Sequence, residues 1–335
     1  MSKKHVAVLM GGMSSEHEVS MASGAKVLGS LDQEKYRVTP VIISKDGLWR
    51  FSEEPPRDMF DAVPCLKRLH VDCAFIALHG AFGEDGRLQG MLDLLGIPYT
   101  SSGCAASALA IDKIRSKAIV RDAGIRVANH LAVDLATWRA ESEAILRQVA
   151  DRIGFPCVAK SPLQGSSMGM AIPQNPEAFR SGMEDVFKYG DMAMIEQFIA
   201  GTEVTCAVLD VDRKRAPRAL PVTEIRPISS SYFDYYAKYT PGASLEITPA
   251  EIAPELAAQV QDMAVRAHAV VGCSIWSRSD MIIDAKGPVW IEVNTVPGLT
   301  PTSLFPQAAA AVGISYAQLL DLFVEAAMAK RNSAS

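Results

Sequence analysis

The sequence has little that would mark a secreted, membrane-bound or nucleic-acid-binding protein. None of its six cysteines forms a C-x-x-C pair and four lie in apolar segments, so we expect buried free thiols in a reducing compartment. The apolar run at residues 5–10 is too short for a signal peptide or a membrane span, and no later run is long enough for a span. The net charge of −5 argues against nucleic-acid binding over a broad surface. These absences predict a cytoplasmic protein with no membrane or nucleic-acid partner.

Two phosphate-binding fingerprints are also missing. The chain contains neither G-x-x-x-x-G-K-[ST] nor G-x-G-x-x-G. This excludes a Walker-type loop and a dinucleotide fingerprint.

What the sequence does contain is an alternation of strand and helix patterns. A length of 335 residues suggests two or three domains. A capping box at Ser15 predicts a helix that runs to about Leu28, and strands alternating with helices predict a doubly wound α/β unit. Ligands of such units sit beyond the carboxyl ends of the strands, where Gly11-Gly12 and His79-Gly80 fall. The predicted strands are residues 5–10, 37–44 and 73–80.

The rest of the chain alternates less regularly. Asp112 is expected to cap a helix that ends at Gly124, and residues 250–271 have apolar residues at helical steps of three and four. Residues 227–244 lack periodicity and hold five Tyr or Phe residues, which is typical of a functional or disordered long loop. We expect domain boundaries near residues 110 and 190. Also expected are a helix over 136–152, a glycine-rich loop over 164–170, and strands in PCVAK, MAMIEQFI and EVTCAVLDV.

Two neighbouring strand patterns near the C-terminal end carry polar residues on one face. In VWIEVNTVPG, Glu292 and Asn294 are two residues apart, and in IWSRSDMII so are Arg278 and Asp280. A three-residue loop over 285–287 would pair Asp280 with Glu292 on one face. A loop of two or four residues would place the two carboxylates on opposite faces.

With the three-residue loop, this hairpin becomes a candidate metal site. Carboxylate and amide oxygens are hard ligands suited to Mg²⁺. Two carboxylates about 4 Å apart repel by about 4 kcal/mol at an effective dielectric constant of about 20, and a divalent cation removes that repulsion. The alternative is a solvated face with a surface Arg–Asp pair. From the hairpin alone the two interpretations have equal weight.

A phosphate site is indicated elsewhere in the chain. The loop QGSSMGM lets backbone amides approach a phosphate, although a flexible surface loop is the common alternative. Lys160 ends an apolar strand, and Lys113 opens a helix, where a cation is unfavourable unless an anion is bound there. A solvated side chain is the simpler interpretation of either lysine. Together with the hairpin, these features predict a nucleoside triphosphate site.

The chain resembles the D-alanine–D-alanine ligases of the ATP-grasp superfamily. The likeness covers nearly the whole chain, and several long motifs occur in the family's order. The motifs are GGMSSEHEVS (11–20), HGAFGEDGRLQGMLDLLGIPYTSSG (79–103), DKIRSK (112–117), GSSMGM (165–170), IEQFIAGTE (195–203), YAKY (236–239), RSD (278–280) and EVNTVPGLTPTSLFP (292–306).

The resemblance implies an ATP-grasp fold, of class α/β and α+β, with an N-terminal Rossmann-like (pre-ATP-grasp) domain. An N-terminal α/β substrate-binding domain would span residues 1–110. A central ATP-grasp subdomain with a glycine-rich lid would span 111–195. A C-terminal subdomain with the metal site and the long loop would span 196–335. ATP would lie between the two ATP-grasp sheets, and the resemblance implies a homodimer formed through the N-terminal domain.

The resemblance also implies which residues hold ATP and metal. Asp280, Glu292 and Asn294 would bind two Mg²⁺ ions, with Mn²⁺ as an alternative. The residues implied for ATP are Lys113 and Lys160 at the phosphates, Glu196 with the backbone from Gln197 to Ile199 at the adenine, and Glu203 at the ribose.

The remaining roles concern the amino-acid substrates. By the resemblance, Glu16 would hold the ammonium of the first D-alanine. It also lies in the first turn of its predicted helix, where a carboxylate is favoured. Ser166 and Tyr239 would link to Glu16 and close the long loop. Arg278 and the backbone amide of Gly298 would stabilise an oxyanion. The other contacts are His79 in the first subsite, Lys238 at the transferred phosphate, and Ser303 and Leu304 at the carboxylate of the second D-alanine.

The implied activity is ATP-dependent ligation of two D-alanines through an acyl phosphate, for peptidoglycan precursors. Phosphoryl transfer depends on positioning and charge neutralisation, and the later tetrahedral oxyanion needs fixed positive charge. Three alternatives remain: a ligase of other amino acids, a D-alanyl-D-hydroxy acid ligase, and a non-catalytic ATP-binding paralogue.

Four positions depart from the family pattern. Ser161 separates Lys160 from Pro162, Gln164 precedes GSS in place of an acidic or small residue, Ser279 replaces a hydrophobic residue between Arg278 and Asp280, and Gln197 stands where a lysine is frequent. They concern the lid and the adenine contact and leave the charged groups in place.

Overall fold

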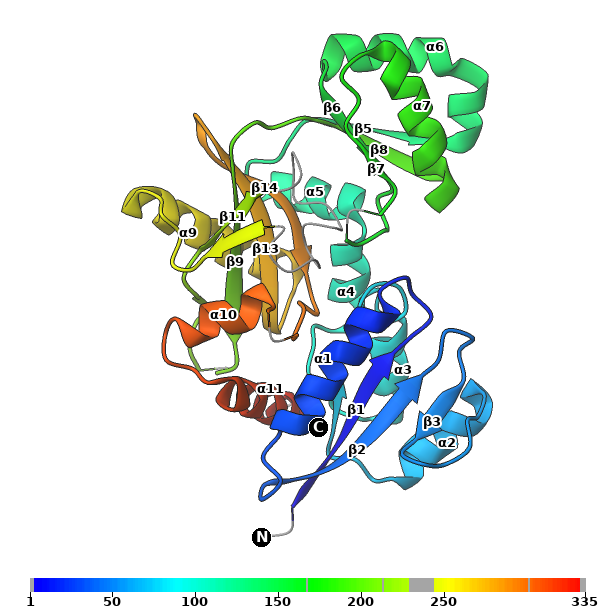
Figure 1. The fold of residues 1–335 in the computed structure, drawn as a ribbon, viewed down its shortest axis with the longest axis vertical. Helices are drawn as coiled ribbons and strands as arrows, with labels where there is room; N and C mark the ends of the chain where they lie inside the picture. Colours follow the sequence, from blue (N-terminus) through cyan, green and yellow to red (C-terminus); the bar gives the residue numbers. More distant parts are fainter. Residues whose placement is uncertain (1–2, 167, 213, 229–243, 301, 332–335) are drawn as a thin grey trace.

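In the computed structural model, the described residues form three β-sheets. The structure describes residues 3–166, 168–212, 214–228, 244–300 and 302–331. Figure 1 shows the N-terminal sheet at one end of the molecule, a second sheet with α6 and α7 at the other end, and the third sheet between them.

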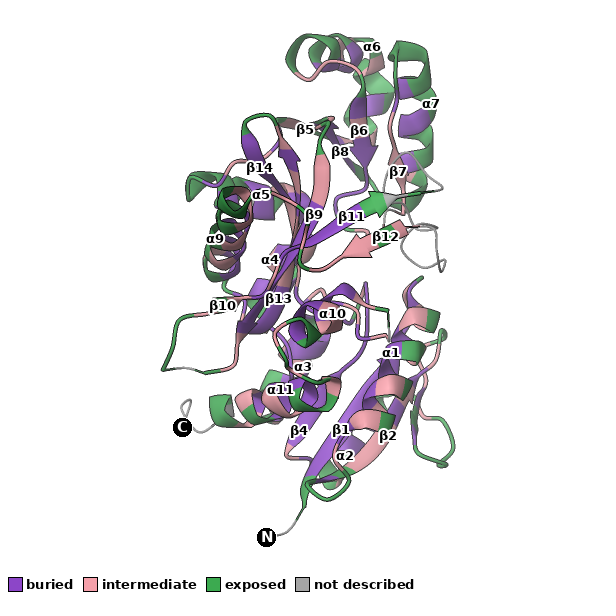
Figure 2. Ribbon diagram, turned by 60° about the vertical axis from the view of Figure 1, so that its left-hand side comes forward, coloured by how far each residue is buried: buried purple, intermediate pink, exposed green. Residues whose placement is uncertain are grey.

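The N-terminal sheet has four strands in the order β3-β2-β1-β4. Its central strand β1 (Lys4–Gly11) is buried along all but its first residue, as Figure 2 shows. It pairs in parallel with β2 (Tyr36–Ile43) and β4 (Cys73–Ile76), and β3 (Trp49–Phe51) adds an antiparallel edge. A strand buried on both faces is built from a continuous apolar run, which is the predicted pattern. Its helices are α1 (His17–Ser30), α2 (Met59–Arg68) and α3 (Arg87–Leu95).

Two local predictions for this part of the chain are corrected. The strand predicted at 73–80 ends at Ile76, and the chain turns at Gly80, whose φ of +71° suits glycine. The predicted cap at Ser15 is wrong, because helix α1 begins at His17 and its N-cap is Glu16, whose side chain makes no capping hydrogen bond. Ser14 orders this turn instead: its hydroxyl accepts from the Glu16 amide (3.2 Å) and donates to the carbonyl of residue 79 (2.7 Å).

The second sheet has the order β5-β8-β6-β7. The predicted helix over 136–152 is confirmed as α6 (Leu135–Arg152), which Asp134 caps by accepting from the Thr137 amide. Trp138 and Phe179 meet edge to face at 5.7 Å and close the core beneath the sheet. The other elements are β5 (His130–Asp134), β6 (Cys157–Lys160), β7 (Met170–Ala171), α7 (Pro176–Val186), the 3-10 helix η1 (Phe187–Tyr189) and β8 (Met192–Gln197).

The third sheet has the order β12-β11-β9-β13-β14, and β10 pairs with β9. The predicted helix over 250–271 is confirmed as α9 (Pro254–Val271), with Gly272 in the left-handed conformation after it. Its apolar face packs on the sheet together with α5 (Lys113–Asp122), which Asp112 caps as predicted. The strands are β9 (Thr202–Asp210), β10 (Arg218–Ala219), β11 (Thr223–Pro227), β12 (Ser244–Ile247), β13 (Ile275–Asp284) and β14 (Gly287–Asn294).

The C-terminal helices tie the third sheet to the first. Trp276 on β13 stacks on Phe323 of α11 (Tyr316–Arg331), with ring centroids 4.4 Å apart, and meets Phe305 of α10 (Leu304–Ala310) edge to face at 5.1 Å. These rings share one buried cluster with β1 and β4. Helix α4 (Cys104–Ile111) lies between α3 and α5 along the chain. The two sheets therefore rest on a common core.

Three further expectations concern thiols, membranes and the long loop. All six cysteines are free as predicted, but Cys104 is exposed, because it begins α4 outside the apolar runs that bury Cys73, Cys157 and Cys206. Within the described ranges, no helix has the length and apolar character to cross a bilayer. The predicted loop at 227–244 falls largely on residues 229–243, so Lys238 and Tyr239 lie outside the described residues.

Candidate active site

The polar hairpin forms, but by a different route from the predicted one. Asp280 is the direct cross-strand partner of Glu292, as predicted. The predicted three-residue loop is wrong, because Asp284 pairs with Gly287 and only two residues make the turn. In an unbroken register Asp280 would then face residue 291. A β-bulge between Asp280 and Met281 absorbs one extra residue of β14 and restores the Asp280–Glu292 pair.

Asp280 is held by donors on three strands. The Nε and Nη2 atoms of Arg278 each donate to its carboxylate over 2.9 Å. The hydroxyl of Thr205 on β9 donates over 2.6 Å, and the side-chain amide of Asn294 on β14 over 3.2 Å. Since Arg278 and Asp280 are each only 16% exposed, this pair differs from the solvated surface pair that was the alternative.

Glu292 and Lys113 form the neighbouring ion pair. The Nζ atom of Lys113 lies 3.0 Å from Glu292 Oε2 and donates to the backbone carbonyl of Gln164 over 2.7 Å. Lys113 is the first residue of α5, directly after its cap Asp112. The lysine therefore joins the acidic hairpin to the glycine-rich loop.

A pocket opens between the second and third sheets beside these groups. Its charged lining residues include Lys113, Lys160, Asp280 and Glu292. Most of the remaining lining is apolar, and Glu203 contributes to the wall from β9. A pocket lined by both apolar and charged side chains suits a flat ring attached to a polyanion. The apolar part and the adjoining strand end are lined by Val158, Met168, Met170, Ile172, Gln197, Phe198, Ile199, Met281, Ile282 and Ile291.

Glu196, in the wall of this pocket, is paired with two lysines. Its Oε1 atom contacts the ammonium of Lys160, and its Oε2 atom lies 2.7 Å from Nζ of Lys117. Burial alone would raise the pKa of Glu196, but the two lysine charges outweigh it and lower the pKa to about 2. Burial also lowers the pKa of Lys117, against the opposing effect of Glu196. The carboxylate is thus held fully ionised.

Lys117 is a residue that the sequence reasoning missed. Its side chain is fully buried, which is rare for lysine without a partner. It lies four residues after Lys113 on α5, so both point from the same helix face. That spacing in DKIRSK is the signal that could have identified it.

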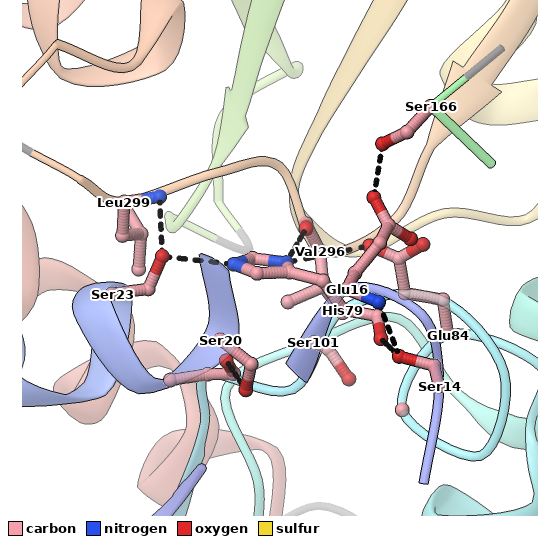
Figure 3. A network of polar contacts seen from close by, with 12 residues as sticks. Ser14, Glu16, Ser20, Ser23, His79, Glu84, Ser101, Ser166, Val296 and Leu299 are labelled. Atoms are coloured by element: carbon pink, nitrogen blue, oxygen red, sulfur yellow. Dashed lines mark hydrogen bonds and ion pairs between the residues drawn. The ribbon is translucent and has the colours of Figure 1, made fainter. Parts of the chain in front are cut away.

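A second polar network lies where β1 and β4 end (Figure 3). The hydroxyl of Ser166 donates to Oε1 of Glu16, across 150 positions of sequence. His79 is buried between Ser23, whose hydroxyl is 2.9 Å from Nε2, and Glu84, whose Oε1 is 3.6 Å from Nδ1. The glycine-rich loop therefore reaches the N-terminal sheet.

The charged side chains of this network shift one another's pKa values. Burial lowers the pKa of His79, but the carboxylates of Glu84 and Glu16 outweigh it, so the pKa of His79 is raised. Burial raises the pKa of Glu84. The sequence reasoning missed Glu84, although it lies within HGAFGEDG, because its pairing with His79 depends on the turn at Gly80.

The segment after β14 meets this network rather than the pocket between the sheets. The amide of Leu299 donates to the hydroxyl of Ser23 over 3.3 Å. A Cβ atom at Gly298 would come within 2.8 Å of the Ser303 hydroxyl, so a larger residue would require Ser303 to move. Ser303 precedes α10 and accepts from the Thr300 amide (2.9 Å), while Leu304 is buried. Gly298, Ser303 and Leu304 therefore lie outside the lining of the pocket between the sheets.

Comparisons with known proteins agree along the whole chain. Family models described as "D-ala D-ala ligase N-terminus" and "D-ala D-ala ligase C-terminus" match residues 5–102 and 119–325. A D-alanine–D-alanine ligase of Halalkalibacterium halodurans is 42% identical over 327 residues, covering 97% of this chain and 99% of the relative. The structure of the D-alanine–D-alanine ligase from Coxiella burnetii matches with a TM-score of 0.84 at 28% identity, covering 100% of this chain and 96% of that one. A Bacillus anthracis D-alanine–D-alanine ligase complexed with ATP gives 0.80 at 30% identity, over 99% and 100%.

Proposed function

The chain belongs to the D-alanine–D-alanine ligase family, and from this premise we propose that it joins two D-alanines into D-alanyl-D-alanine, forming ADP and phosphate from ATP. The product would serve as a peptidoglycan precursor. The observation that carries the proposal is the pairing of Asp280 with Glu292 beside Lys113 and Lys160 in one pocket. This arrangement joins anion-binding and metal-binding chemistry in one pocket.

ATP would lie in this slot between the second and third sheets. The apolar side chains from β6, β7 and β14 suit the faces of adenine, and Glu196 with the backbone from Gln197 to Ile199 would bind its edge. Glu203 would take the ribose hydroxyls. Lys113 and Lys160 would hold the phosphates, because both are cationic residues that line the pocket.

Two Mg²⁺ ions would be held by Asp280, Glu292 and Asn294. The donor set fits, since two carboxylates are direct cross-strand neighbours and each is balanced by a cation, Arg278 or Lys113. Among the described residues no three His, Cys, Asp or Glu side chains gather as a metal site. Such ions would therefore take further oxygens from the phosphates, as Mg²⁺ commonly does. When bound, they would neutralise charge on the triphosphate.

The first D-alanine would bind beside the network in Figure 3, with its ammonium on Glu16 and His79 lining the subsite. The Ser166–Glu16 hydrogen bond supports this, because it ties the glycine-rich loop to the amino-acid site. Ser166 and Tyr239 would close the site, and Lys238 would reach the transferred phosphate. A closed site would exclude the water that otherwise hydrolyses an acyl phosphate.

The chemistry would follow in two steps. A carboxylate oxygen of the first D-alanine attacks the γ-phosphorus, the bond to ADP breaks, and an acyl phosphate forms. The amine of the second D-alanine, after losing a proton, attacks the acyl carbon, and phosphate leaves. Arg278 and the amide of Gly298 would stabilise the intermediate oxyanion. Ser303 and Leu304 would bind the carboxylate of the second D-alanine.

We also propose how the chain is organised. It would divide at 1–110, 111–195 and 196–335, so that each part carries one of the three sheets apart from the end of β8, which crosses the last boundary. It would form a homodimer through the N-terminal domain. It would act in the cytoplasm.

The proposal is tested by phosphate release from ATP in the presence of different amino acids. D-Alanine should give the fastest release, and mass spectrometry should identify D-alanyl-D-alanine as the product. L-Alanine, D-serine and D-lactate serve as matched alternatives. Equal release with another amino acid would favour a ligase of different specificity. A depsipeptide product would favour the hydroxy-acid alternative, and ATP binding without turnover would favour the non-catalytic paralogue.

A further inference from the structure

Three lysines form ion pairs with two of the glutamates that line the nucleotide pocket, and the pairing among them is unequal. Lys113 is matched with Glu292, whereas Lys117 and Lys160 share the single carboxylate of Glu196. Lys160 belongs to the pocket wall, but Lys117 does not. One of the two lysines on Glu196 can therefore meet a ligand, and the other cannot.

The consequence for ligand binding is electrostatic. A phosphate that draws Lys160 away from Glu196 would leave a buried carboxylate, only 3% exposed, without its countercharge. Leaving a buried charge unpaired is strongly unfavourable. The Nζ atom of Lys117 lies 2.7 Å from Oε2 of Glu196. It would keep this contact when Lys160 moves to a phosphate, and so remove the penalty.

On the basis of the nucleotide site proposed above, we propose that Lys117 is a positioning residue. It neutralises Glu196 and so allows Lys160 to bind the phosphates of ATP. Lys117 acts through Lys160 and Glu196 and does not touch the nucleotide. Its full burial and its place one helical turn after Lys113 keep its ammonium in position. Loss of Lys117 should therefore weaken the binding of phosphates and leave the binding of the base unchanged.

The dissociation constants of ATP and adenosine can therefore be compared, because a purely structural role of Lys117 would affect both ligands equally. In Lys117→Met, binding of ATP requires Lys160 to leave an otherwise unpaired Glu196, so the dissociation constant of ATP should rise by about tenfold or more. Adenosine has no phosphate and leaves the Lys160–Glu196 pair intact. Its dissociation constant should stay within about twofold. Equal weakening of both ligands, or of neither, would overturn the proposal.

The experiment measures ATP and adenosine binding to the full chain by equilibrium dialysis without any amino acid. Arg121→Met is the matched control, because it removes an exposed cation from the same helix one turn beyond Lys117. It should leave both constants unchanged. Should Lys117→Met fail to fold, Lys117→Gln replaces it, with the same expected difference between the two ligands.

A double-mutant cycle tests the coupling directly. In a Glu196→Gln background no carboxylate remains to hold Lys160, so adding Lys117→Met should cause little further loss of ATP affinity. A loss as large as in the unaltered background would contradict the proposal. The result is separable from the proposed activity: an absence of D-alanine-dependent turnover in the wild-type chain would refute the ligase function while leaving the binding comparison intact.

Discussion

Replacing Arg278 by alanine should separate turnover from nucleotide binding. Arg278 donates two 2.9 Å bonds to Asp280 and is proposed to stabilise the oxyanion. It does not belong to the wall of the nucleotide pocket. Asp280 would keep the donors Thr205, at 2.6 Å, and Asn294, at 3.2 Å, so its position should survive the change.

The size of each effect follows from these contacts. Loss of one fixed oxyanion donor lowers kcat by about 10²- to 10³-fold. Loss of a charge-assisted pair that is 16% exposed on both sides should lower the free energy of unfolding by about 1–3 kcal/mol. That is below the effect expected for a fully buried pair, because water screens part of the interaction. The dissociation constant of ATP should change by less than about threefold.

The assay combines D-alanine-dependent phosphate release with equilibrium ATP binding and a denaturation curve. Arg226→Ala is the control, because Arg226 is a half-exposed arginine on β11 of the same sheet, paired with Glu224 and Glu251. It should keep full turnover. Unchanged turnover in Arg278→Ala would contradict this prediction, and so would an ATP affinity that falls in step with kcat.

Three further predictions concern the loop, the buried carboxylate and the core. Ser166→Ala removes the hydrogen bond to Glu16. Steady-state kinetics should then show a KM for D-alanine raised by about three- to tenfold, and a smaller rise in the KM for ATP. An unchanged KM for D-alanine would contradict the link between the loop and the amino-acid site. Glu196 has a pKa lowered from 4.5 to about 2, so the stability from its ion pairs is complete above about pH 4.5 and is lost as pH falls toward 2. Between those values Tm should fall more steeply for the wild type than for Glu196→Gln, and parallel curves would be evidence against the ion pairs. Trp276→Ala empties the site between Phe305 and Phe323 and should lower the free energy of unfolding by about 3–5 kcal/mol in denaturant titration, whereas a loss below about 1 kcal/mol would mean that this cluster does not join the sheets.

The sequence predicted elements whose signals are local. The Asp112 cap, the Gly124 and Gly272 stops and the buried strand β1 are all present, because each depends on a few neighbouring residues. The pairing of Asp280 with Glu292 was also predicted, but through the wrong loop. A two-residue turn and a bulge together give the same pairing as a three-residue loop, and the residue pattern alone does not distinguish them.

Features that depend on distant contacts were missed or came only from family likeness. Lys117 looks like a solvated helix lysine until β8 brings Glu196 against it. Glu84 likewise gains its meaning only when the chain turns back at Gly80 toward His79. The Ser166–Glu16 contact spans 150 positions, and only the resemblance suggested it. Tertiary packing decides such contacts, so no local pattern encodes them.

The most direct measurement is an anomalous difference map from crystals grown with Mn²⁺, a non-hydrolysable ATP analogue and D-alanine. We expect manganese peaks between the analogue's phosphates and the carboxylates of Asp280 and Glu292, with Lys160 on a phosphate. A nucleotide bound elsewhere, or metal peaks that touch neither carboxylate, would contradict it.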